Sequence, residues 1–170
     1  MNKNGIEIER KFLLKSLDPA SKEFYVDSTN ILQFYLSSDE GISRRVREES
    51  SMDDSKVVFT YTEKKDVSPG VREENEKEIT SEEFENLYKE ASTYITKSRH
   101  KFKFPETGDL IWEIDVFRNV TLIIAEIELP SIDHSFEIPA LLRDNIVMEI
   151  TEHPEFNNIN LATIFKGFDA

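Results

Sequence analysis

The sequence predicts an α+β fold: a closed eight-stranded antiparallel β-barrel that forms a tunnel with a charged lumen, with a few helices packed outside it. Charged and apolar side chains alternate with period two in one segment after another, as in strands with one polar and one apolar face. About eight such segments are long and have few interruptions. Closure into a barrel would leave none of these strands with an exposed edge.

The first predicted strand, residues 5–14, shows the alternation most clearly. Glu7, Glu9 and Lys11 share one face of this strand. Ile8 and Phe12 lie on the opposite face. Taken alone, this pattern fits a half-buried strand with a solvated polar face as well as it fits a functional one.

The remaining elements follow from turn and capping signals. A Pro follows Asp18 and opens a short helix, residues 39–41 and 68–70 are turns, and residues 80–83 form a capping box at the start of a helix. Further helices are expected near residues 132–143 and from residue 154 onward. The other strands are expected near residues 30–37, 41–49, 55–65, 70–79, 94–104, 109–118, 121–129 and 145–151.

Length and composition limit the possible functions. The 170 residues are expected to form one domain, residues 1–170, and the net charge of -13 argues against a nucleic-acid partner bound through a broad basic surface. The chain has no cysteine, which fits a cytoplasmic location. It also has no run of eighteen apolar residues and no apolar signal region, so no membrane partner is expected.

The alternation of the first strand returns on the later strands. The charged alternate positions are Arg45, Arg47, Arg72, Glu74, Glu76, Lys97, Arg99, Glu113, Asp115, Glu126 and Glu128. One interpretation is that each strand has a solvated outer face. The other is that the apolar faces pack outward against helices and the charged faces line a polar tunnel. Repetition on six strands favours the tunnel.

In their order along the chain, these motifs resemble the CYTH superfamily, also called triphosphate tunnel metalloenzymes. Residues 7–11 match its ExExK signature, and residues 33–36 resemble its second-strand motif with Phe34 in place of Gly. Similar matches are found at residues 45–47, 72–76, 97–99, 113–117, 126–128 and 149–162. Lys64 corresponds to a fourth-strand lysine of the family, but a slip of one residue would turn it away from the tunnel, so its orientation stays open.

The resemblance implies a role for each of these residues. Two ions, Mg²⁺ or Mn²⁺, would be held by Glu7, Glu9, Glu126 and Glu128. The substrate phosphates would be bound by Lys11, Arg45, Arg47, Lys64, Arg72 and Arg99. Supporting acids would be Glu74, Glu76, Glu113 and Asp115. Lys97 and Tyr35 would act in catalysis, by protonating the leaving group or supporting that step, although Tyr35 fits a plain barrel aromatic equally well.

The charges of this predicted tunnel suit a polyphosphate. Eight acids and seven bases face it, and two divalent cations would make its net charge positive. The resemblance therefore implies a metal-dependent hydrolase that acts by in-line water attack, with inorganic triphosphate as its small-molecule substrate. The alternatives are a thiamine or nucleoside triphosphatase, an adenylyl cyclase of class IV type, and a non-catalytic polyphosphate-binding module. The protein would be a monomer or a homodimer.

Overall fold

The computed structural model of the protein describes residues 5–37, 39–118 and 120–166. The strands are β1 (Ile6–Leu14), β2 (Tyr25–Leu36), β3 (Ile42–Ser51), β4 (Val57–Ser68), β5 (Val71–Ile79), β6 (Thr93–Phe102), β7 (Trp112–Phe117), β8 (Ile123–Glu128) and β9 (Ile146–Glu149). The α-helices are α1 (Ser81–Tyr88), α2 (Ala140–Arg143) and α3 (Asn158–Phe165). Short 3-10 helices are η1 (Pro19–Phe24), η2 (Pro105–Thr107) and η3 (Pro154–Phe156).

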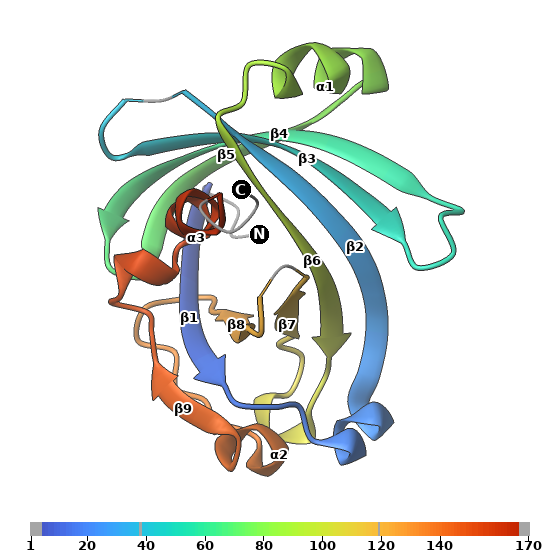
Figure 1. The fold of residues 1–170 in the computed structure, drawn as a ribbon. Coiled ribbons are helices and arrows are strands. Elements are labelled where there is room, and N and C mark those ends of the chain that lie inside the picture. Colours follow the sequence, from blue (N-terminus) through green and yellow to red (C-terminus); the bar gives the residue numbers. More distant parts are fainter. Residues whose placement is uncertain (1–4, 38, 119, 167–170) are drawn as a thin grey trace.

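Eight of the strands close into an antiparallel barrel (Figure 1). They follow one another around it in the order β5, β4, β3, β2, β6, β7, β8 and β1. The ring closes because Ile6–Ile8 of β1 also pair with residues 71–73 of β5. β9 is an additional strand that pairs with the C-terminal half of β1. The predicted eight-stranded barrel is therefore confirmed.

The outer face of the barrel is apolar on two sides, and each side is covered. Phe84 of α1 packs against Phe34 of β2 and Phe59 of β4, and Val46 of β3 is fully buried beneath the same helix. α1 forms here because Thr80 caps it in a capping box with Glu83. Because these aromatic side chains are buried on the outside of the barrel, the opposite faces of β2, β3 and β4 point into its interior.

A second apolar cluster covers the outer faces of β1, β7 and β8. Phe12 and Trp112 lie at its centre, and Leu142 of α2 packs onto them. The segment between β8 and α2 adds Phe136 and Ile138. The helix expected near residues 132–143 is wrong for most of this length, because only Ala140–Arg143 are helical. Phe136 and Ile138 lie two residues apart in a non-helical segment and pack against the cluster with partly buried side chains.

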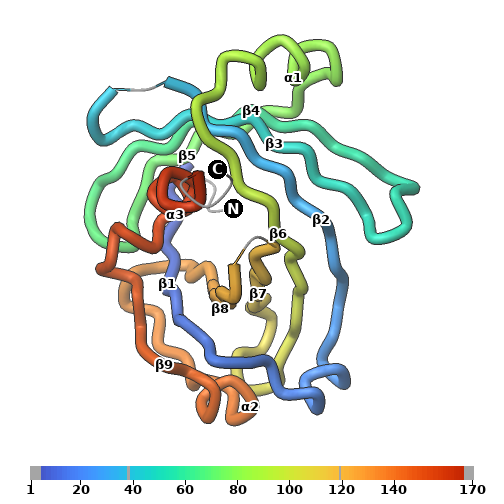
Figure 2. The backbone as a smooth tube through the Cα atoms, in the orientation of Figure 1, coloured from blue at the N-terminus to red at the C-terminus, as the bar shows by residue number. Residues whose placement is uncertain are grey.

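One end of the barrel interior is filled by apolar side chains. Leu13 of β1, Ile95 of β6 and Ile124 of β8 form this cluster together with Leu161 and Phe165 of α3. Figure 2 shows α3 at the upper part of β1, and its buried side chains belong to the same cluster as Ile95 of β6. Apolar packing thus closes one end and leaves the polar remainder of the lumen as a cavity. None of the helices in the described part of the chain has the length and apolar composition needed to cross a membrane.

The point where β1 changes partner from β5 to β9 depends on Gly70. The Glu9 amide donates to the Gly70 carbonyl over 2.9 Å, and the Lys11 amide donates to Thr151 Oγ1 over 3.0 Å. Gly70 has a φ of +71°, and a Cβ atom there would lie 2.7 Å from the Glu9 carbonyl oxygen and 2.8 Å from Thr151 Cγ2. Only glycine fits this position without displacement of the backbone.

We therefore expect Gly70→Ala to lower the free energy of unfolding by about 2–4 kcal/mol, the sum of a left-handed φ and an overpacked contact. Gly41→Ala is the matched control, because Gly41 has a φ of +73° but open space around its Cβ position. It should cost about 1–2 kcal/mol. Urea denaturation of both variants measures the difference, and equal losses would show that the close approach at Gly70 is unimportant.

Candidate active site

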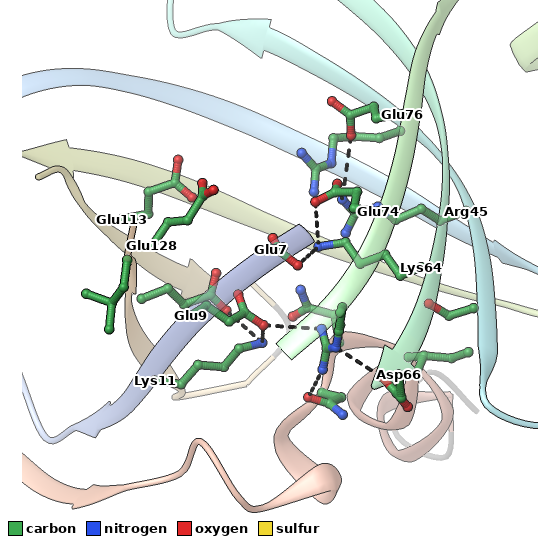
Figure 3. A pocket seen from close by; sticks show the side chains of 18 of the residues that line it. Glu7, Glu9, Lys11, Arg45, Lys64, Asp66, Glu74, Glu76, Glu113 and Glu128 are labelled. Atoms are coloured by element: carbon green, nitrogen blue, oxygen red, sulfur yellow. Dashed lines mark hydrogen bonds and ion pairs between the residues drawn. The ribbon is translucent and has the colours of Figure 1, made fainter. Parts of the chain in front are cut away.

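The barrel encloses a cavity of about 690 Å³ with a polar wall (Figure 3). It contains fourteen of the sixteen site residues predicted from the sequence. These are Glu7, Glu9, Lys11, Tyr35, Arg45, Arg47, Lys64, Arg72, Glu74, Glu76, Arg99, Glu113, Glu126 and Glu128. Lys97 and Asp115 are fully buried behind this wall and do not line the cavity. The charged faces therefore lie inside the barrel, as the tunnel interpretation predicts.

Strand register brings the charged positions of β1 next to those of β8 and β5. Glu9 lies opposite Glu128, and Lys11 lies opposite Glu126. Glu7 lies opposite Arg72. Each of these residues has the orientation that the period-two alternation of its own strand predicts.

The register of β4 settles the orientation of Lys64, which the sequence leaves open. Lys64 pairs with Ser43 of β3 and Glu74 of β5, so it shares the inward face of those strands. Its ammonium lies 2.6 Å from Glu7 and 3.5 Å from Glu74, and Figure 3 shows these three side chains converging from β4, β1 and β5. Burial alone would raise the pKa of Glu7, but Lys64 outweighs it and lowers that pKa.

A second group of ion pairs lies around Lys11. Its ammonium is 2.9 Å from Glu9 and 3.3 Å from Glu126. Burial opposes the charge of Lys11, yet the two carboxylates raise its pKa. Burial would also raise the pKa of Glu126, but Lys11, Lys97 and Arg99 hold it well below its usual range. These groups therefore remain charged inside the barrel.

The arginines of β3 are less completely paired. Arg45 lies 3.8 Å from both Glu74 and Glu76, and its buried Nε atom has no hydrogen-bond partner among the described residues. Burial, together with Arg45 and Arg99, lowers the pKa of Arg47 to about 10. An anion bound in the cavity would give Arg45 a hydrogen-bond partner and would favour the charged form of Arg47. The wall of the cavity at β3 is therefore suited to an anionic ligand.

Behind the wall, Asp115 holds two cations together. Arg99 donates to Asp115 from Nε and Nη2, each over 2.7 Å, and Lys97 donates to the same carboxylate. Burial lowers the pKa of Lys97 to about 8, although Asp115 opposes this shift. Arg99 also reaches Glu113 and, over 3.1 Å, Glu126. Asp115 thus fixes the direction in which Arg99 enters the cavity.

The two residues predicted to act in catalysis occupy different positions. Tyr35 lines the cavity and accepts a hydrogen bond from Gln33, whereas Lys97 is covered and bonded to Asp115. Their catalytic roles stay predictions.

The carboxylates that the resemblance assigns to metal ions occupy neighbouring strand positions. Glu7 and Glu9 follow one another on the inner face of β1, and Glu128 is opposite Glu9. Carboxylate oxygens are ligands that Mg²⁺ and Mn²⁺ prefer. Among residues 5–37, 39–118 and 120–166, however, no three acidic or histidine side chains converge closely enough to hold an ion. Lys64 and Arg72 instead bind Glu7 and Glu9. The donor set fits a divalent cation in residue type and position, and binding requires these carboxylates to leave their cationic partners.

Several cavity residues were not identified from the sequence. Asp66 faces inward two positions after Lys64 and lies 3.1 Å from Arg72, and Asp109 lies in the segment before β7. Period-two alternation would have found Asp66. Asn157, which accepts a hydrogen bond from Arg72 Nη2 over 2.7 Å, comes from the segment before α3 and has no comparable signal.

The depressed pKa of Glu126 makes stability sensitive to acid. A carboxyl whose folded pKa lies below its ordinary value of 4.5 contributes stability that is fully present above that pH and is lost as the pH falls through the folded pKa. We expect the free energy of unfolding to fall as the pH is lowered below about 5, and to fall less steeply in Glu126→Gln. Glu73→Gln, on the outer face of β5, should keep the wild-type slope. Denaturant unfolding at several pH values measures this, and identical slopes for all three proteins would contradict it.

The fold is shared with several solved structures, although no family model and no curated protein matches this sequence. The inorganic triphosphatase NE1496 has a TM-score of 0.59 and 26% identity, over 92% of this chain and 93% of its own. The PH1819 protein from Pyrococcus horikoshii OT3 has a TM-score of 0.61 and 14% identity, over 75% and 80% of the two chains.

A third structure is HpAC1 from Hippeastrum, which is described as having a dominant triphosphatase activity. Its TM-score is 0.52 and its identity 18%, over 74% of this chain and 80% of its own. At this identity, as for PH1819, the likeness concerns the fold alone. The closed barrel and the similarity to NE1496 together confirm the resemblance to the CYTH superfamily that the strand motifs indicated.

Proposed function

We propose that this chain is a metal-dependent hydrolase of triphosphate compounds, with inorganic triphosphate as the expected substrate. The observation that carries the proposal is the cavity of about 690 Å³ inside the barrel, whose β3 wall bears Arg47 and the incompletely paired Arg45. A polyphosphate is a compact polyanion that guanidinium groups bind with charge-assisted, bidentate hydrogen bonds. The 26% identity to a structure described as an inorganic triphosphatase supports this choice of substrate.

In this proposal the cations of the cavity bind the phosphate chain. Arg45 and Arg47 approach from β3, and Lys11, Lys64 and Arg72 approach from β1, β4 and β5. In the absence of an anion, Lys11, Lys64 and Arg72 are held by carboxylates of the cavity. A bound phosphate would take over these contacts, so the cationic side chains are positioned before the ligand arrives.

The acids freed by this change of partner would hold the metal. Glu7, Glu9, Glu126 and Glu128 are the proposed ligands of Mg²⁺ or Mn²⁺, with two ions expected. When bound, such cations neutralise phosphate charge and favour in-line attack by water on the terminal phosphorus. The arginines would stabilise the charge that develops on the phosphate oxygens.

Tyr35 and Lys97 are the proposed groups for the leaving phosphate. Tyr35 is the nearer candidate, because it lines the cavity. Lys97 would act from behind the wall, by holding Asp115, the carboxylate that orients Arg99.

A product assay separates this function from the alternatives. Purified protein with Mg²⁺ or Mn²⁺ is incubated with inorganic triphosphate, thiamine triphosphate or ATP, with a chelator as the metal control. We expect orthophosphate and pyrophosphate from inorganic triphosphate, with turnover lost in the chelator. Cyclic AMP and pyrophosphate from ATP would overturn the hydrolase proposal in favour of a cyclase. Binding of triphosphate without any turnover would favour a binding module.

Glu9→Gln tests the proposed metal ligands. Glu9 is buried and bonded to Lys11 and Arg72, and glutamine keeps its size while removing the anionic oxygen. We expect kcat to fall by at least about a hundredfold with the fold retained, as judged by circular dichroism. Glu73→Gln, on the outer face, should retain full activity. Unchanged turnover in Glu9→Gln would remove Glu9 from the site.

A further inference from the structure

Gln33 lies between two residues of the proposed site and touches both. It is on the inner face of β2, directly opposite Arg47 of β3 and two positions before Tyr35. Its side chain is completely buried. Arg47 Nε donates to Gln33 Oε1 over 3.1 Å, and Gln33 Nε2 donates to the Tyr35 hydroxyl oxygen.

Arg47 fixes the orientation of the Gln33 amide. A guanidinium group is only a donor, so the atom of Gln33 that faces Arg47 must be the carbonyl oxygen. The amide nitrogen then faces Tyr35 and can only donate. The Tyr35 oxygen must therefore accept from Gln33, and its own proton must point elsewhere.

The direction left for this proton is the cavity. Tyr35 lines the cavity, and its other neighbours include Ile95, Phe117 and Ile124, which offer no acceptor. Across the described ranges of the chain, the hydrogen bond from Gln33 is the one that the Tyr35 hydroxyl makes, and no protein group accepts its proton. A buried hydroxyl proton without an acceptor is unfavourable until a ligand supplies one.

We propose that Gln33 is a positioning residue. Arg47 holds its amide, and the amide in turn leaves the Tyr35 hydroxyl free to donate its proton only to a phosphate oxygen in the cavity. The inference rests on the proposed function, because the phosphate oxygen that accepts from Tyr35 of β2 belongs to the proposed substrate. It assigns to Gln33 a role in directing a proton that goes beyond filling space in the barrel wall. The contact would matter most in the transition state, where the phosphate oxygen gains charge.

Gln33→Glu reverses the direction of this hydrogen bond at almost constant shape. A carboxylate accepts from both neighbours, from Arg47 as before and now from the Tyr35 hydroxyl, so the tyrosine proton turns away from the cavity. With inorganic triphosphate and Mg²⁺, we expect kcat to fall by about tenfold or more, as it should in Tyr35→Phe. Asn86→Asp, which makes the same chemical change at an exposed position of α1, should keep wild-type kcat and KM.

A double-mutant cycle separates the proton direction from the added charge. In the Tyr35→Phe background there is no hydroxyl proton to redirect, so Gln33→Glu should lower kcat further by less than about threefold. An equal loss of kcat in both backgrounds would overturn the proposal, because the charge alone would then explain it. No loss of kcat in Gln33→Glu would overturn it as well.

Gln33→Met provides the same test if the buried carboxylate prevents folding. Methionine keeps the volume but neither donates to Tyr35 nor accepts from Arg47, so we expect a smaller loss of kcat than in Gln33→Glu, and a loss that shrinks further in the Tyr35→Phe background. A loss in kcat of equal size with and without the hydroxyl would reject the positioning role. Wild-type turnover in the same assay distinguishes this failure from a failure of the proposed function itself.

Discussion

Ion pairs between the strands allow this barrel to keep charged side chains in its interior. The alternation of side chains places one face of each strand inside, and most inner positions around the cavity are charged. An isolated buried charge costs several kcal/mol, so carboxylates and cations must neutralise one another across strands. Glu7 is neutralised in this way by Lys64. Lys11 is neutralised by both Glu9 and Glu126. A slip of one residue in any strand would break these pairs, which therefore help to fix the register.

The same balance explains why the barrel is suited to a polyanion. Where acids and cations match, as around Lys11, each group is kept charged by its neighbours. At β3 the match is incomplete, because Arg45 has a buried unpartnered nitrogen and Arg47 has a lowered pKa. A phosphate chain would complete the pairing there and release carboxylates elsewhere for cations. The proposed hydrolase activity and the role of Gln33 both follow from this local excess of donors.

The alternation within each strand predicts which residues face the interior of the barrel, but not which of them reach the cavity. It places Glu7 and Glu9 correctly, because each strand carries its own period. Closure of the sheet is expected because it removes exposed edges, and the pairing of β1 with β5 provides it. The orientation of Lys64 depends on pairing with β3 and β5, which no single segment encodes. Lys97 has the predicted inward face, yet packing and Asp115 place it behind the cavity wall. The helix expected near residues 132–143 fails because contacts with the outer cluster override local propensity.

The most direct test of this account is a crystal structure of the protein with Mg²⁺ and the non-hydrolysable imido analogue of inorganic triphosphate. In that structure we expect phosphate oxygens within hydrogen-bonding distance of Arg45 and Arg47 inside the barrel. We also expect Lys64 and Lys11 to have moved from their carboxylates to the phosphates. An analogue bound on the outer surface, or bound inside with all the ion pairs of the cavity intact, would contradict it.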